Sequence, residues 1–450
     1  MLKKIYHIAL AFATYLTTTP PAEAQYSPTP DSICRINAEG QAVSRSHFRY
    51  DSQERQTGVA HLVWNKKTGL WVGTFQEVVE YDALGNVVAR QTSFWDADDD
   101  DWRLGETETA QFDTAGRQTA VEVMRWNRER RAWIGERKRH DKYDERGKRV
   151  RQETFRWDDD KGKWTPSEAV ETEYNTAPPR QKRSDTRLAW RNGEWSNVEK
   201  TEYEYDGKTN ALKSSTRHEW HDGAWTPQTR TAYTRLTENG IGTVCSHSLR
   251  FAGGQWVNDE KVTTLLDSHG AEVSITRERW AGIIWNVVQK ERIDINYDQW
   301  GNRTHEARYI MTGTNTWAGR SVTDRTFSEY GDILSEVRME WDTHNQTWKG
   351  VVNTKTEYSA AGDIVAEQKQ KWDRKGHRWV PQSKSSYQYD DEHNRTSEST
   401  SSWNPLKNAY EEFFRGRTSY RLNRDGNIAE VTEQTWENGE WRTRQITRYY

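Results

Sequence analysis

The chain has 450 residues, of which 65 are Lys or Arg and 68 are Asp or Glu, so its formal net charge is only −3. This balance argues against a general nucleic-acid-binding or membrane-surface role, because either role needs a basic excess. Only 33% of the residues are hydrophobic, yet the chain contains 24 Trp and 20 Tyr. The small net charge and the aromatic content together predict an ordered protein without a thick aliphatic core.

Residues 1–24 have the pattern of a secretory signal peptide. Lys3 and Lys4 supply a positive start, residues 5–16 form an apolar run, and residues 22–24 (Ala-Glu-Ala) provide small residues for cleavage. The run is too short to span a hydrocarbon core of roughly 30 Å, and no later segment approaches that length. We therefore expect an exported protein, periplasmic, cell-surface or secreted, that is cleaved near Ala24 and has no membrane span.

Residues 25–58 precede the repeats described below and are predicted to form a divergent N-terminal capping segment. They contain Cys34, and the only other cysteine is Cys245. Export permits a disulfide between the two, which would connect the start of the mature chain to its middle. Two buried, unpaired thiols are the interpretation we favour, and two isolated cysteines cannot build a zinc or redox motif.

Aromatic residues recur after residue 60 with a period of about 31 residues, which predicts a tandem array of thirteen units over residues 59–450. One series occupies positions 64, 95, 126, 157, 190, 220, 251, 280, 309, 341, 372, 403 and 436, all Trp except Phe251 and Tyr309. The second occupies positions 71, 102, 133, 164, 195, 225, 256, 285, 317, 348, 379, 410 and 441, all Trp except Tyr410. Only Trp300 lies outside both series.

The first turn of each unit lies between the two aromatic residues. Its short form, as in Asn192-Gly193, suits a type I′ hairpin that places Trp190 opposite Trp195. Longer turns keep the same opposition in the pairs Trp64–Trp71, Trp95–Trp102, Trp126–Trp133 and Trp372–Trp379. Each cross-strand aromatic pair contributes about 0.2–1 kcal/mol, so a row of such pairs can stabilise a sheet that buries little aliphatic surface.

The second turn follows another aromatic residue and reads Y-D-A-L-G-N at 81–86 and Y-D-Q-W-G-N at 297–302. Asp at the first position bonds to the backbone ahead, and Gly takes the left-handed conformation. The two turns leave about ten residues for each strand, which excludes the crossovers that parallel strands need. The sequence therefore predicts an all-β fold, one long antiparallel meander of two-stranded repeats. Because sheets twist, it should coil into a superhelix or close into a shell.

These Tyr-Asp-x-x-Gly-Asn/Arg/Lys turns resemble the YD repeats of RHS proteins and, more loosely, the hairpin arrays of MORN-variant repeats. The resemblance covers about residues 59–450 and implies a tandem β-hairpin fold. It also implies the closed, cargo-enclosing shell of RHS proteins. This sequence departs from the YD pattern because every unit contains an additional hairpin flanked by Trp, which lengthens the period.

Few residues are candidates for chemistry. Asp96, Asp98 and Asp100, in an acidic hairpin tip, could ligate Ca²⁺, but a solvated turn is the interpretation we favour, because the ligand spacing of an EF-hand is missing. The same holds for residues 158–160, a second acidic tip. His218 and His221 should lie on opposite faces of a strand and not share a metal. No nucleophile elbow, phosphate-binding loop or HExxH motif is present, so we expect no catalytic residue and no cofactor.

Residues 233–256 are the one stretch where the pattern loosens, and they form either a decayed unit or an irregular site. Our first functional hypothesis is an exported, non-enzymatic repeat protein that acts as an interaction surface or structural spacer at the cell envelope, with a protein or a glycan as partner. A carbohydrate-binding array of exposed Trp and a YD-type shell are the alternatives, and an exported polysaccharide hydrolase is the enzymatic rival. An exposed final strand could also pair with another chain and cause end-to-end association.

Overall fold

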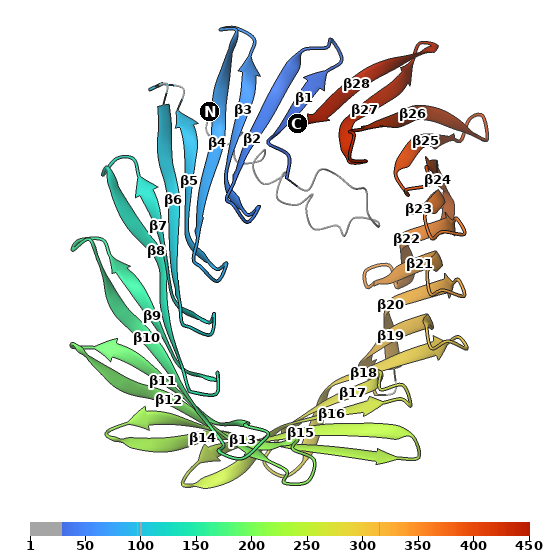
Figure 1. Ribbon diagram of the computed structural model, residues 1–450. Coiled ribbons are helices and arrows are strands. Elements are labelled where there is room, and N and C mark those ends of the chain that lie inside the picture. The colour runs from blue at the N-terminus through green and yellow to red at the C-terminus, as the bar shows by residue number, and fades with distance from the viewer. Residues whose placement is uncertain (1–28, 97, 100, 315) are drawn as a thin grey trace. The chain divides into compact units, whose positions relative to one another are not determined.

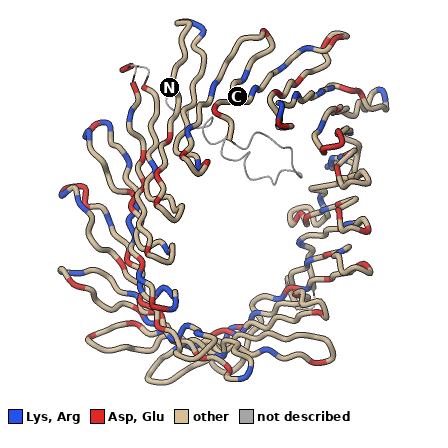
Figure 2. Tube along the Cα trace, viewed as in Figure 1, with Lys and Arg blue, Asp and Glu red and all other residues tan. Residues whose placement is uncertain are grey.

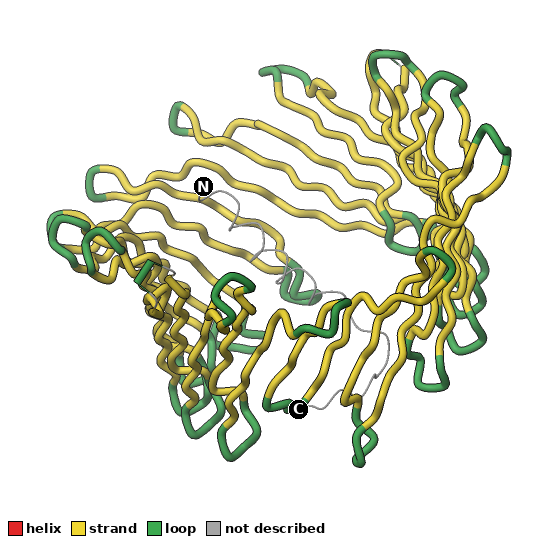
Figure 3. The backbone as a smooth tube through the Cα atoms, turned by 90° about the horizontal axis from the view of Figure 1, so that it is seen from above, coloured by secondary structure: helices red, strands yellow, loops and turns green. Residues whose placement is uncertain are grey.

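The computed structural model describes residues 29–96, 98–99, 101–314 and 316–450, so the predicted signal peptide lies outside the described residues. In this part of the chain all regular structure is β, and Figure 3 shows only strands and turns. The 28 strands belong to one sheet, and the recorded strand pairs are antiparallel. The prediction of an all-β antiparallel meander is confirmed.

The chain divides into two compact units. Unit 1 consists of the described residues up to Thr74 together with Val352–Tyr450, and unit 2 consists of Phe75–Val351. Two strands contain the boundaries: β4 (Leu70–Tyr81) and β22 (Thr347–Tyr358). The other strands of unit 1 are β1 (Ser32–Asn37), β2 (Ala42–Tyr50), β3 (Gln56–Asn65), β23 (Ile364–Asp373), β24 (Arg378–Tyr389), β25 (Arg395–Asn404), β26 (Ala409–Leu422), β27 (Ile428–Glu437) and β28 (Glu440–Tyr449).

The strands that lie wholly in unit 2 pair successively along the chain. They are β5 (Val87–Asp96), β6 (Asp101–Phe112), β7 (Gln118–Asn127), β8 (Ala132–Tyr143), β9 (Arg149–Asp158), β10 (Lys163–Tyr174), β11 (Lys182–Arg191), β12 (Glu194–Tyr205), β13 (Leu212–His221), β14 (Ala224–Glu238), β15 (Ile241–Ala252), β16 (Gln255–Leu266), β17 (Glu272–Trp280), β18 (Trp285–Tyr297), β19 (Arg303–Gly313), β20 (Thr316–Phe327) and β21 (Ile333–Asp342). Because the strands alternate in direction, the Trp-flanked turns of unit 2 lie along one edge of its sheet and the Asp-Gly turns along the other.

In unit 1 the first strand pairs with the last. β1 lies between β2 and β28, with Ile33 opposite Tyr449 and Asn37 opposite Gln445 (Figure 1). The N–H of Asp31 also donates to the carbonyl of Tyr450 at 2.7 Å. The expectation of an exposed final strand is therefore wrong, because β1, which belongs to the predicted capping segment, covers that edge.

The two kinds of turn have the predicted backbone conformations. Asn192 and Gly193 have φ values of 53° and 88°, as a type I′ turn requires. In the second turn, Gly85 has a φ of 88° and its N–H donates to the carbonyl of Asp82. The loosened stretch 233–256 contains an ordinary hairpin of β14 and β15, which turns at Asn239-Gly240. With 15 residues, β14 is longer than the strands on either side of it.

Buried apolar side chains are small and scattered along the strands. In unit 2 they include Val121, Val123, Ala169, Leu188 and Ile293, each less than a tenth exposed. In unit 1 they include Cys34, Ile36, Val59, Ile428 and Val431. This distribution agrees with the low hydrophobic content and leaves the aromatic residues to supply most of the remaining cohesion.

Candidate functional site

The paired aromatic residues meet across the first turn of each unit. Twelve of the thirteen predicted pairs have their ring centroids 4.9–5.4 Å apart in edge-to-face geometry, the arrangement that aromatic quadrupoles favour. They are Trp64–Trp71, Trp95–Trp102, Trp126–Trp133, Trp157–Trp164, Trp190–Trp195, Trp220–Trp225, Phe251–Trp256, Trp280–Trp285, Trp341–Trp348, Trp372–Trp379, Trp403–Tyr410 and Trp436–Trp441.

The thirteenth pair differs from the expectation. Trp317 lies opposite Met311, whereas Tyr309 lies opposite Gly319. The guanidinium of Arg292 lies over both aromatic rings, 4.5 Å from the centroid of Tyr309 and 5.5 Å from that of Trp317. A cation therefore takes the place of the missing ring-to-ring contact in this unit.

The second aromatic residue of a unit also contacts the preceding unit. The indole N–H of Trp164 donates to the carboxylate of Glu122 at 2.6 Å, and the amide of Gln368 donates to the hydroxyl of Tyr410 at 3.2 Å, 42 residues away in both cases. The guanidinium of Arg417 covers the ring of Trp441 at 4.4 Å. The paired rings are mostly half-buried, and these contacts occupy their remaining faces. They are therefore poor candidates for free binding platforms.

The Tyr-Asp turns join neighbouring hairpins at the other edge. The Oδ1 of Asp82 accepts the N–H groups of Leu84 and Asn86, each at 2.9 Å, and its pKa is lowered chiefly by the side-chain hydrogen bond from Asn86. The hydroxyl of Tyr143 donates to the carbonyl of Gln118, 25 residues earlier, at 3.0 Å. The same reach recurs in Tyr174–Arg149, Tyr389–Ile364 and Tyr420–Arg395. The Tyr-Asp turn therefore stabilises the contact between neighbouring hairpins.

Charged residues of both signs are interspersed along the strands (Figure 2). They form cross-strand ion pairs such as Lys138–Glu122 at 3.1 Å, Arg277–Glu260 at 2.7 Å and Arg448–Glu430 at 2.6 Å. Exposed pairs of this kind contribute at most about 1 kcal/mol each. Their value lies mainly in avoiding like charges opposite each other on the sheet.

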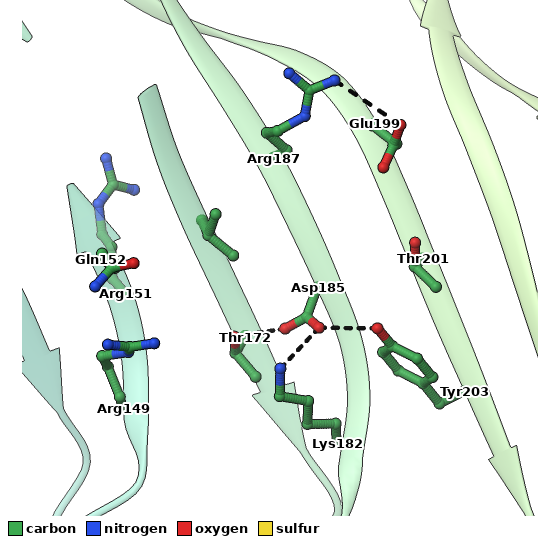
Figure 4. Close-up of a pocket in the computed structure, with 11 residues that line it drawn as sticks. Arg149, Arg151, Gln152, Thr172, Lys182, Asp185, Arg187, Glu199, Thr201 and Tyr203 are labelled. Atoms are coloured by element: carbon green, nitrogen blue, oxygen red, sulfur yellow. Dashed lines mark hydrogen bonds and ion pairs between the residues drawn. The ribbon is translucent and has the colours of Figure 1, made fainter. Parts of the chain in front are cut away.

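A polar recess of about 390 Å³ lies on β9–β12 in unit 2 (Figure 4). Asp185 is at its centre and accepts hydrogen bonds from the Thr172 hydroxyl at 2.6 Å, the Lys182 ammonium at 2.9 Å and the Tyr203 hydroxyl at 2.9 Å. Above them the guanidinium of Arg187 lies 3.8 Å from Glu199. Asp185 and Trp190 are five residues apart on β11, so their side chains lie on opposite faces of the strand.

The hydrogen bonds in this recess fix the protonation of its two central groups. Burial raises the pKa of Asp185, but the three donors outweigh burial and hold the pKa below its usual value. Burial, together with the hydrogen bond to Asp185, raises the pKa of Tyr203 to about 12. Asp185 is therefore ionised and Tyr203 neutral at physiological pH. Both groups suit the binding of a polar ligand better than general acid–base catalysis, which works best with a pKa near the operating pH.

A second recess, in unit 1, is lined by Tyr387, Tyr389 and His393. His393 occupies the glycine position of its turn with a φ of 62°, and its Nδ1 lies 2.9 Å from Asp363 in the preceding turn. The hydrogen bond from His393 to Asp363 raises the pKa of the imidazole. Sequence inspection missed both recesses, because their residues come from separate strands or turns and match no motif.

The candidate Ca²⁺ ligands have other partners. Asp96 accepts the N–H of Asp98 at 2.9 Å and forms an ion pair with Arg103 at 2.6 Å, whereas Asp100 lies outside the described residues. His221 lies 3.3 Å from Glu219, and His218 lies 4.0 Å from Glu202. No group of three or more His, Cys, Asp or Glu side chains within the described ranges is arranged to hold a metal ion.

Both cysteines are free thiols, so the disulfide considered from the sequence does not form. Cys34 is buried on β1, where its neighbours across the ladder are Arg45 and Arg448. Cys245 is half-buried on β15 and accepts a hydrogen bond from the Thr263 hydroxyl at 3.8 Å. Among the residues that the structure describes, no helix has the length and apolarity required to cross a membrane.

No family model matches this sequence, and no curated protein matches it. Several solved structures do. The crystal structure of TcdB2-TccC3 matches 96% of this chain with 14% identity and a TM-score of 0.22, and this chain spans only 29% of that one. A porin-like protein from Bacteroides uniformis matches 62% of this chain and 94% of its own, with 8% identity and a TM-score of 0.18. A DUF3836 family protein from Parabacteroides distasonis matches 22% of this chain and 91% of its own, with 10% identity and a TM-score of 0.18.

Proposed function

We propose that this protein is an exported, non-catalytic repeat scaffold that acts as an interaction surface or structural spacer at the cell envelope. One observation carries this proposal: the residues that repeat are engaged in joining one hairpin to the next. Trp164 contacts Trp157 and reaches Glu122 in the preceding unit, while Tyr143 reaches Gln118 at the other end of the strands. A sequence that repeats its cohesive contacts in this way builds an extended surface.

The chemistry of the recess on β9–β12 also favours a binding role. Asp185 is held ionised by three donors, and Tyr203 is held neutral, so neither group titrates near pH 7, where a general acid–base catalyst works best. The sequence pattern of residues 1–24 supports export. A partner protein or glycan at the envelope follows from these two considerations together.

The proposal is tested by expressing the full chain in its source organism with a tag after Tyr450, followed by fractionation and cross-linking. We expect the tagged chain in an exported fraction, cross-linked to the same partner in repeated experiments. The purified chain should hydrolyse no polysaccharide. Retention in the cytoplasm, or a hydrolytic activity that the Asp185→Asn substitution abolishes, would refute the proposal.

A sheet that encloses or presents a partner is a second candidate, favoured by the pairing of β1 with β28. A sheet closed through its terminal strands has no edge to aggregate, which suits a container. Small-angle scattering from the purified chain tests this candidate. A hollow, compact particle is expected, and an extended rod would contradict it.

A further inference from the structure

Trp300, the one Trp outside the paired series, lies at the tip of the turn between β18 and β19. Its side chain is 58% exposed, whereas the paired Trp residues are mostly half-buried. The equivalent position in the next turn, between β20 and β21, holds Tyr330, which is 83% exposed. The equivalent position in the preceding turn, between β16 and β17, holds His269, which is also exposed. Three consecutive turns of unit 2 thus carry a ring at the same position.

The fold does not require a ring at this position. What the turn uses is the backbone N–H: that of Trp300 donates to Asp298 at 2.9 Å, and that of Tyr330 donates to Ser328 at 3.2 Å. Other turns of unit 2 have Ala115 and Arg146 at the same place and make the same bond, at 2.9 and 3.0 Å. Within the described residues, neither the Trp300 ring nor the Tyr330 ring has a ring or cation partner, so folding does not explain these two aromatic residues.

The spacing of the rings follows from the sheet. The three turns lie on the same edge of unit 2 and are separated by two strands each, so equivalent positions recur about every 10 Å. His269 is held in place, since its ring stacks on Tyr297 with centroids 4.0 Å apart and planes 22° apart. The hydroxyl of Tyr297 in turn donates to Asp267 at 2.7 Å. The first ring of the row is therefore anchored through Tyr297, which is itself fixed by its hydrogen bond to Asp267.

This pattern favours a carbohydrate chain over a protein surface as the occupant. A protein interface needs a contiguous apolar centre depleted of charge, whereas the rings here alternate with exposed polar residues such as Ser268, Gln299 and Glu329. A linear polysaccharide presents the complementary pattern, because the apolar C–H face of a sugar ring recurs along the chain between polar hydroxyl edges. Trp and Tyr faces suit such stacking.

We propose that His269, Trp300 and Tyr330 form a row that binds a linear polysaccharide, with the two exposed rings stacking on sugar faces. This inference rests on the proposed function, because it names the partner class of the interaction surface. Trp300 provides the largest ring and therefore the main contact. His269 sets the end of the row.

Affinity electrophoresis of the full chain in gels that contain hydroxyethyl cellulose, xylan, β-1,3-glucan or galactomannan tests the row. At least one polysaccharide should retard the chain, and Trp300→Ala with Tyr330→Ala should weaken this retardation at least tenfold. Trp300→Phe should retain part of it. Leu84→Ala is the matched control, because Leu84 occupies the same turn position and is 67% exposed. Circular dichroism verifies that each variant is folded.

If none of the four polysaccharides retards the chain, the proposal that the row binds a polysaccharide is wrong. It is also wrong if the double variant is retarded as strongly as the parent chain. Envelope cross-linking with the double variant separates the two proposals. If the double variant still captures the envelope partner while no polysaccharide binds, the proposed interaction surface is supported and the proposed polysaccharide-binding row is wrong. If a captured protein is lost with the double variant while no polysaccharide binds, the row is a protein interface and the carbohydrate assignment is wrong.

Discussion

The indole N–H of Trp164 on β10 donates to the carboxylate of Glu122 on β7 at 2.6 Å, across the two strands between them. The rings of Trp157 and Trp164 both lie against Gly135 on β8, and the absence of a side chain there leaves room for Trp164 to reach β7. A Cβ built on Gly135 would lie within 2.6 Å of both rings. Gly319 has the same relation to Trp348. At these two places, the stacking of neighbouring hairpins depends on glycine in one unit and tryptophan in the next.

Gly135→Ala should therefore destabilise the protein by about 1–3 kcal/mol, because overpacking forces the two indoles to move. The measurement is urea unfolding followed by tryptophan fluorescence. Gly207→Ala is the control, since a Cβ there meets nothing within 4 Å and that residue has no positive φ. If Gly135→Ala and Gly207→Ala change the free energy of unfolding equally, the absence of a side chain at Gly135 is not needed for the packing of Trp164.

The edge-to-face pair Trp190–Trp195, with centroids 5.1 Å apart, should show a measurable coupling. A double-mutant cycle with Trp190→Ala and Trp195→Ala should give about 0.5–1.5 kcal/mol of interaction energy. The same cycle on Trp190 and Trp225, which belong to different pairs, is the control and should give close to zero. A coupling energy near zero for Trp190 and Trp195 would mean that the pair stabilises only by burying area.

The periodic sequence was sufficient to predict the hairpins and most ring pairs, because turn chemistry and cross-strand opposition are local. The prediction of the pair Tyr309–Trp317 was wrong, because the residue opposite Trp317 is Met311. Tyr309 lies two positions earlier on the same strand, so it fits the 31-residue period almost as well as Met311 does. The β1–β28 pairing could not be predicted, because nothing local in residues 32–37 specifies a partner more than 400 residues away. The recess around Asp185 was also missed, because Thr172, Lys182 and Tyr203 are ordinary strand residues until the register brings them together.

Acid should weaken the link between Asp144 and Arg180, whose guanidinium donates to the Asp144 carboxylate at 2.6 Å. This hydrogen bond is the main reason that the pKa of Asp144 is lowered to about 2. Because the folded pKa is depressed, the stabilisation is present above the unfolded pKa of about 4 and is lost as pH falls through about 2. Thermal unfolding between pH 5 and pH 2 should show a smaller loss of Tm in Asp144→Asn than in the parent chain. Identical pH profiles would contradict the assignment.

High pH should remove the stabilisation that Tyr203 provides, just as low pH removes that of Asp144. The folded pKa of Tyr203 is raised to about 12, so its stabilisation is complete below the unfolded pKa of about 10 and is lost as pH rises through 12. The difference between the ultraviolet titrations of the parent chain and Tyr203→Phe isolates this phenol. In Asp185→Asn the titration should move toward pH 10 without reaching it, because burial is the larger cause. A phenol that titrates at pH 10 in the parent chain would exclude the buried hydrogen bond to Asp185.

Removal of β1 should convert the protein from a monodisperse species into a self-associating one. Without residues 29–39, the N–H and C=O groups of β28 that now pair with Ile33–Asn37 become an unprotected edge, and unprotected edges recruit other strands. Light scattering during size-exclusion chromatography should show oligomers whose mass rises with concentration.

A synthetic peptide of residues 31–37 should suppress these oligomers, because it restores the donors and acceptors of β1. The same peptide with Arg35→Pro should not suppress them, because proline removes an N–H from the ladder. A truncated chain that elutes as the parent does, with or without peptide, would mean that β28 is protected by something other than its pairing with β1.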